Sequence, residues 1–158
     1  MANFEQAIKK TLESEGDYSN NPSDSGKETR FGISKKAYPY EDISSLTIER
    51  AKELYKRDYW DKVAGDRIIS QAIAESILDF SINAGISTSI SLAQRVVKTT
   101  ADGIIGQNTI AAINAMAPEY FLNCFAVLKV KRYISITESN SKNREFFFGW
   151  IKRTVKDL

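Results

Sequence analysis

Two side chains that often carry enzymatic chemistry are scarce: the chain has no histidine and only one cysteine, Cys124. Without histidine, Ser-His and Cys-His hydrolytic sites cannot form, and the common zinc sites are excluded. A single cysteine cannot form a disulfide within the chain, and its apolar neighbours indicate a buried, unreactive thiol. Carboxylates remain as the obvious acid–base groups, and we expect neither a metal ion nor another cofactor.

Long apolar runs are also missing. No eighteen consecutive residues are apolar, so we expect no membrane-spanning helix. The first six residues, MANFEQ, lack the basic start and the apolar stretch of a signal peptide, so we expect synthesis in the cytoplasm without such a signal. Of the 158 residues, 42% are hydrophobic, which suits one compact domain, or one domain with a small appended helical unit.

Positive charge is concentrated near the end of the chain. The net charge is only +2, but residues 129–158 contain eight basic and three acidic side chains. Such a surface can favour an anionic polymer, either cell wall or nucleic acid, or it can be an ordinary solvated helix face. The solvated face is the favoured interpretation.

Helical spacing of apolar residues runs through most of the chain. Phe4, Ala7, Ile8, Thr11 and Leu12 form one stripe, and the preceding Asn3 with Gln6 resembles a capping box. Further helices are predicted after Thr47, between Gly65 and Gly85 with Ile69 and Ala72 on the apolar face, and at about 87–99, 109–116 and 118–137, with a last one around Phe147 to Val155. The sequence therefore predicts an all-α fold class.

Residues 16–46 differ from the rest. They are rich in turn-forming residues and have no helical period. The segment is too long for a simple connection, so we expect a functional polar loop or a short β-hairpin.

Glu15 extends the apolar stripe of the first helix by one more turn. A carboxyl at the inner end of an apolar helix has a raised pKa, because burial penalises its charged form, and this suits a general acid. The alternative is that the helix frays and Glu15 is solvated beside Gly16. Asp24 and Thr29 follow at a spacing that can supply the second carboxylate and the hydroxyl of a glycoside hydrolase, although this pattern also arises by chance.

The run EGDYSNNPSD at positions 15–24, continuing through Gly26, Thr29 and FGIS at 31–34, resembles the start of the glycoside hydrolase 108 muramidases. The likeness extends through YWD at 59–61 and DFSINAG at 79–85. The last third is similar to the family's peptidoglycan-binding helical unit, with Gln94, DGIIG at 102–106 and Thr109. The glycines of that motif also permit a tight turn, so its first role is structural.

The resemblance implies a mainly α, lysozyme-like helical domain with a polar loop or short β-hairpin after the first helix. It also implies a catalytic part at residues 1–85 and a peptidoglycan-binding-like part at 86–158, packed into the same compact unit. The implied activity is that of a lysozyme or endolysin-type N-acetylmuramidase, which hydrolyses the β-1,4 bond between N-acetylmuramic acid and N-acetylglucosamine.

The resemblance assigns the general acid to Glu15. Asp24 is expected to stabilise the transition state or orient water, and Thr29 to hold that water. Two features depart from related patterns: Asp17 replaces the second glycine of the family's Glu-Gly-Gly-Tyr motif, and the gap from Asp24 to Thr29 is one residue shorter than in phage-type lysozymes.

Further residues are candidates for sugar binding, through aromatic stacking or amide hydrogen bonds: Tyr18, Asn21, Tyr38, Trp60, Asp79 and Asn83. Two of these assignments have structural alternatives. Trp60 ends an apolar stripe and fits a core position better than a ligand site. Asp79 and Asn83, four residues apart, either border a sugar cleft or order the turn at Gly85.

We expect bacterial peptidoglycan as the partner, a monomer, no nucleic acid, and action on the cell wall after release through a holin-type membrane protein. The alternatives are a lytic transglycosylase and a catalytically inactive peptidoglycan-binding protein. A basic helical nucleic-acid binder ranks last, because it leaves the turn-rich segment unexplained.

Overall fold

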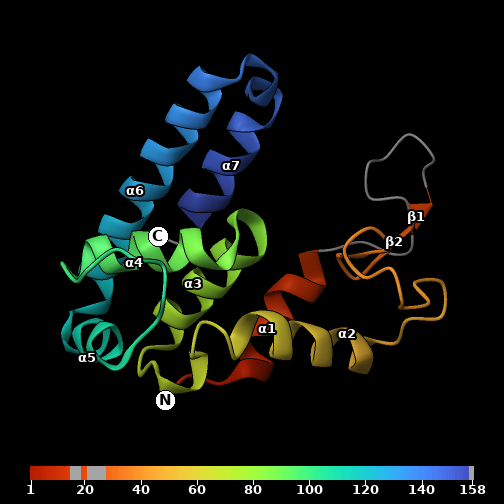
Figure 1. Cartoon of the computed structure of the whole chain (residues 1–158), viewed down its shortest axis with the longest axis horizontal. Coiled ribbons are helices and arrows are strands. Elements are labelled where there is room, and N and C mark those ends of the chain that lie inside the picture. Colours follow the sequence, from red (N-terminus) through yellow and green to blue (C-terminus); the bar gives the residue numbers. More distant parts are fainter. Residues whose placement is uncertain (15–18, 21–27, 157–158) are drawn as a thin grey trace.

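The computed structural model describes residues 1–14, 19–20 and 28–156. Its helices are α1 (Phe4–Ser14), α2 (Ile48–Tyr55), α3 (Gln71–Ala84), α4 (Ile86–Val96), α5 (Gln107–Ala115), α6 (Pro118–Ser139) and α7 (Arg144–Lys156). Short helical turns are η1 (Lys56–Trp60, a π-helix), η2 (Gly65–Arg67) and η3 (Ser141–Asn143). The strands are β1 (Ser19–Asn20), β2 (Glu28–Arg30) and β3 (Ile33–Ser34). The predicted mainly α fold is confirmed, and the region expected to be a polar loop or short β-hairpin contains a small three-stranded antiparallel sheet (Figure 1).

Side-chain caps set where several helices begin. The hydroxyl of Thr47 accepts a hydrogen bond from the Arg50 amide at 3.1 Å, as the sequence predicts for α2. At α1, the side chain of Asn3 accepts from the Gln6 amide at 3.0 Å. The Asn3 amide itself donates to the side chain of Gln71 at 2.7 Å. In a capping box, the side chain of Gln6 would accept from the Asn3 amide, but here Gln71 does so. This hydrogen bond connects the start of α1 to the start of α3.

The third helix begins later than its apolar spacing predicts. Ile69, expected on the buried face, is 61% exposed and lies outside α3. Ser70 caps α3 by accepting from the Ile73 amide at 3.4 Å. Gly65–Arg67 form the separate η2 turn, and α3 begins only at Gln71.

Strands β2 and β3 form a tight hairpin. In the three-stranded antiparallel sheet, β2 lies between β1 and β3. Phe31 and Gly32 connect β2 to β3 with φ of 52° and 73°, and two positive φ values are what a type I′ turn requires. The hydroxyl of Tyr55 donates to the Phe31 carbonyl at 3.0 Å, which fixes the hairpin against α2.

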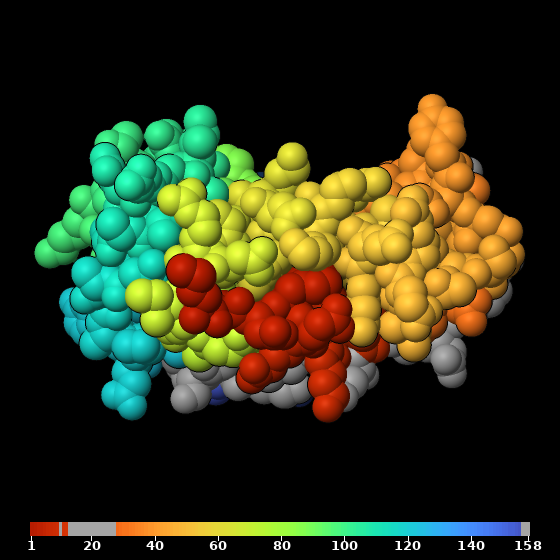
Figure 2. Space-filling view, turned by 90° about the horizontal axis from the view of Figure 1, so that it is seen from below, coloured from red at the N-terminus to blue at the C-terminus, as the bar shows by residue number. Residues whose placement is uncertain are grey.

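One apolar core joins the early and late helices. The central helix α3 contacts α1, α4 and α6. Phe80 of α3 packs edge-on against Phe125 of α6, with ring centroids 5.7 Å apart. In the space-filling view (Figure 2), the red residues of α1 lie between the yellow residues of α2 and η1 and the yellow-green start of α3. The antiparallel pair α6 and α7 extends from this core (Figure 1).

Among the described residues, no single helix is long and apolar enough to cross a membrane, and only the bent pair α5 and α6, taken together, passes that test by length and composition.

Candidate functional site

A surface groove runs past the corner between α3 and α4. One cavity of about 380 Å³ lies among Tyr38, Asp58, Tyr59 and the residues of that corner. A second cavity, of about 340 Å³, shares Asp58 and Ile86 with the first and continues to the loop at 103–105. We call the two together the central groove. It brings one aspartate, one lysine and two tyrosines together with five isoleucines.

Asp58 is held ionised within the central groove. The guanidinium of Arg57 hydrogen-bonds its carboxylate at 2.7 Å, and the hydroxyl of Tyr38 donates to it at 3.0 Å. The Arg57 hydrogen bond is the main reason why the pKa of Asp58 lies below its usual value. Burial, together with the bond to Asp58, raises the pKa of Tyr38. Asp58 can therefore accept hydrogen bonds from a ligand but is poorly suited to donate a proton.

The principal catalytic predictions fall partly outside the described residues. Glu15, Tyr18, Asn21 and Asp24 all lie outside them. Thr29 is described: it is the half-buried middle residue of the central strand β2, opposite Ser19 in β1 and Ser34 in β3. Of the predicted sugar-binding residues, Tyr38 lines the central groove.

Trp60 is a core residue, and its assignment as a sugar-binding residue was wrong. Its side chain has no exposed surface, and its ring packs against Phe4 with centroids 5.7 Å apart. The indole N–H donates to Asp66 at 2.8 Å, and a Cβ at Gly65 would lie 2.4 Å from the ring. A fully buried ring offers no face to a sugar, which agrees with the structural alternative kept open by the sequence.

Asp79 and Asn83 face α7. The Asn83 amide donates to the backbone carbonyl of Asp79 at 2.6 Å, and Arg153 of α7 donates to the Asn83 side chain. The Arg153 guanidinium also lies 3.9 Å from the Asp79 carboxylate. Neither residue lines the central groove, so this polar pair connects α3 to α7.

Asp58 and Tyr59 are groove residues that the sequence interpretation missed, although YWD at 59–61 was noticed. The reason is local: residues 56–60 form a π-helical turn, which breaks the spacing of an α-helix. Extending the α2 stripe through this turn therefore gives no reliable guide to which side chains face the surface. Among the described residues, no group of three His, Cys, Asp or Glu side chains can hold a metal ion.

The motif at 94–109 is held together by hydrogen bonds to the buried side chain of Gln94. The side-chain amide nitrogen of Gln94 donates to Asp102 at 2.8 Å and to the Ile104 carbonyl at 3.0 Å, while its oxygen accepts from the Gly103 amide at 2.9 Å. Thr109 accepts a longer bond, at 3.3 Å. Gln94 is 1% exposed, so its contacts are structural, as the turn chemistry predicts.

Two family models match successive parts of the chain. A family model described as Glycosyl hydrolase 108 matches residues 8–85, and one described as Predicted Peptidoglycan domain matches residues 88–155. Twelve chains of solved structures also match. One of them, reported as the structure of SagA from Brucella abortus, is 28% identical with a TM-score of 0.80, and the match covers 98% of this chain and 90% of that chain. No curated protein sequence matches. The chain therefore belongs to the glycosyl hydrolase 108 family, as a glycoside hydrolase of the muramidase type that carries a peptidoglycan domain.

Proposed function

We propose that this protein hydrolyses the β-1,4 bond between N-acetylmuramic acid and N-acetylglucosamine, with Glu15 as the general acid. The observation that carries the proposal is the match of residues 8–85 to the Glycosyl hydrolase 108 family model, within which the run EGDY begins at Glu15, the residue that follows α1 in the sequence. Phe4, Ala7 and Ile8 of that helix are buried in the core. The helix that precedes Glu15 in the sequence is therefore anchored in the core.

The second half of the proposed catalytic set comes from the segment between α1 and the hairpin. We assign Asp24 to stabilisation of the cationic transition state or orientation of water, and Thr29 to holding that water. The position of Thr29 in the central strand of a hydrogen-bonded sheet supports this role, because both neighbouring strands restrict its backbone.

The central groove is the proposed sugar-binding surface. Tyr38 and Tyr59 offer aromatic surface, and the ionised Asp58 can accept hydrogen bonds from sugar hydroxyls. Its isoleucine-rich lining suits the apolar faces of pyranose rings. These assignments rest on the residues that line the groove.

Product chemistry tests the proposed reaction. Purified sacculi are digested with the protein, and the products are reduced with borohydride and weighed by mass spectrometry. Hydrolysis at the proposed bond yields reducible N-acetylmuramic acid ends. Reducible N-acetylglucosamine ends would place the cut at the other glycosidic bond. Anhydro-muramic ends, which borohydride does not reduce and which are one water lighter than an unreduced N-acetylmuramic acid end, would identify a lytic transglycosylase. Absence of any cleavage would indicate an inactive wall-binding protein.

We also propose an endolysin-like setting for this activity. The protein is made in the cytoplasm and reaches the wall as a monomer, through a membrane opening of the holin type. A catalytic part at 1–85 and a wall-binding part at 86–158 would then act as one unit. The shared core through α3, α4 and α6 supports this arrangement, because helices of both parts pack against one another in it.

A further inference from the structure

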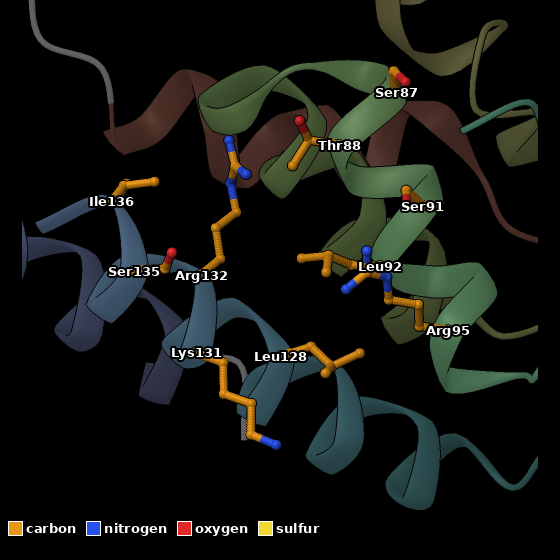
Figure 3. A pocket seen from close by; sticks show the side chains of 10 residues that line it. All are labelled: Ser87, Thr88, Ser91, Leu92, Arg95, Leu128, Lys131, Arg132, Ser135 and Ile136. Carbon is orange, nitrogen blue, oxygen red and sulfur yellow. The ribbon is translucent and has the colours of Figure 1, made fainter. Parts of the chain in front are cut away.

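A second groove lies between α4 and α6 and shares no lining residue with the central groove. Its cavity volume is about 480 Å³, within the range of small-ligand sites. Figure 3 shows side chains from both helices converging on it. Its lining includes Thr88, Ser91 and Arg95 from α4, with Lys131 and Arg132 from α6. We call it the α4–α6 groove.

The lining of the α4–α6 groove is cationic. It contains three basic side chains, Arg95, Lys131 and Arg132, and no carboxylate. Within the part of the chain that the structure describes, no acidic group pairs with any of the three. Several other cations do have carboxylate partners, among them Arg50 with Glu41 and Lys52 with Glu5. The groove is therefore complementary to an anion that the described chain does not itself supply.

The remaining lining favours a ligand that is only partly charged. Of its apolar lining residues, Leu92 is buried and Leu128 is half-buried, while Thr88 and Ser91 contribute hydroxyl groups. In Figure 3, Arg95 and Leu92 come from α4, and Arg132 comes from α6 on the other side of the groove. Guanidinium groups pair with carboxylates through two parallel hydrogen bonds, which a point charge cannot match.

Peptidoglycan carries its carboxylates on one of its two components. The glycan strands of N-acetylated sugars are neutral once the lactyl group is amide-linked, whereas the attached stem peptides have free side-chain and terminal carboxylates. Apart from Ser87, the groove is lined by residues within 88–155, the range that matches the peptidoglycan domain. A groove without any carboxylic acid also has no proton donor for glycoside cleavage, so it fits binding and not catalysis.

Resting on the proposed function, in which peptidoglycan is the substrate, we propose that the α4–α6 groove binds the carboxylates of peptidoglycan stem peptides. Arg95 and Arg132 are the main anchors, with Lys131 adding charge at the rim. The α4–α6 groove then binds the stem peptide of a wall strand, while the glycan is cleaved at the proposed catalytic residues.

The test measures binding of a purified disaccharide-peptide to the full-length protein by isothermal titration calorimetry. The double variant R95Q/R132Q should bind about tenfold more weakly. The matched variant K142Q/R144Q removes the same charge from exposed positions outside the groove and should bind within about twofold of wild type. Amidation of the peptide carboxylates should weaken binding by the wild-type protein as much as the double substitution does.

Three results would overturn the assignment: equal binding by R95Q/R132Q, equal binding of the amidated peptide, or tighter binding of a DNA oligonucleotide that the same two substitutions abolish. Hydrolysis of peptide-free glycan strands is measured in parallel, because it reports the proposed catalytic function separately. Wild-type protein that cleaves these strands but does not bind the disaccharide-peptide would refute the groove assignment alone. Protein that binds the peptide but cleaves no glycan would refute the catalytic proposal and support the groove.

Discussion

Gly103 shows how closely one residue of the 94–109 motif is constrained. Its φ is +75°, and a Cβ at this position would lie 2.3 Å from the hydroxyl and 2.9 Å from the carbonyl oxygen of Ser87. We predict that Gly103→Ala lowers the free energy of unfolding by about 2 kcal/mol or more, because both backbone strain and overlap are introduced. Urea denaturation monitored by circular dichroism measures the change.

Gly149 provides the control for this substitution. It lies inside α7, and a Cβ there meets no atom within 4 Å. Gly149→Ala should stabilise the protein by about 0.5–1 kcal/mol, since alanine is the better helix former. If Gly103→Ala were as well tolerated as Gly149→Ala, the assigned contact with Ser87 would be incorrect.

Asp58 makes a pH-dependent contribution to stability. Its pKa is lowered in the folded state, chiefly by the hydrogen bond from Arg57. The carboxylate therefore stabilises the fold fully above the unfolded aspartate pKa of about 3.9, and the contribution is lost as the pH falls through the lower folded value. We predict that wild type and Asp58→Asn differ by a constant unfolding free energy between pH 5 and 7, and that the difference narrows below about pH 4. A difference that widens on acidification would contradict this ion pair.

At the scale of elements, most helices follow from apolar spacing and turn residues. The stripe from Phe4 to Leu12 and the cap at Thr47 correctly predict α1 and α2. Apolar spacing does not predict the structure where the backbone leaves the α-helical period, as in the π-helical turn of η1. It also misplaces the start of α3, because the capping hydroxyl of Ser70 fixes that start. The sheet was expected only as a loop or hairpin, because strands this short carry no alternating pattern.

The start of α2 provides a direct test at this scale. We predict that Thr47→Ala lowers the free energy of unfolding by about 1 kcal/mol, because the Arg50 amide loses its side-chain acceptor. Thr47→Ser keeps the hydroxyl and should stay close to wild type in the same denaturation experiment. Equal destabilisation by serine and alanine would show that the lost methyl group, and not the cap, is responsible.

For the whole molecule, the shared core predicts cooperative unfolding. Buried side chains from α1 through α6 form one cluster, and α3 contacts helices of both family-matched parts. We predict a single calorimetric transition with equal calorimetric and van't Hoff enthalpies. Two separate transitions would mean that the parts are independent domains that only touch.

The site was less predictable than the fold. Tyr38 lines the central groove, but Asp58 was missed, and Trp60, a sugar-binding candidate for which the sequence favours a core position, is buried. A sequence shows which residue types are present, but the choice between core and surface depends on how helices pack. The role of Asp79 and Asn83 likewise became clear only once α7 brought Arg153 beside them.

The most direct test of the central claim is the rate at which Glu15→Gln releases reducing ends from purified sacculi. Loss of a general acid should lower the rate by about 10²–10⁴-fold, while the melting temperature stays near that of wild type. A variant that keeps more than about a tenth of the wild-type rate, or loses activity only in proportion to lost stability, would contradict the assignment of Glu15 as the general acid.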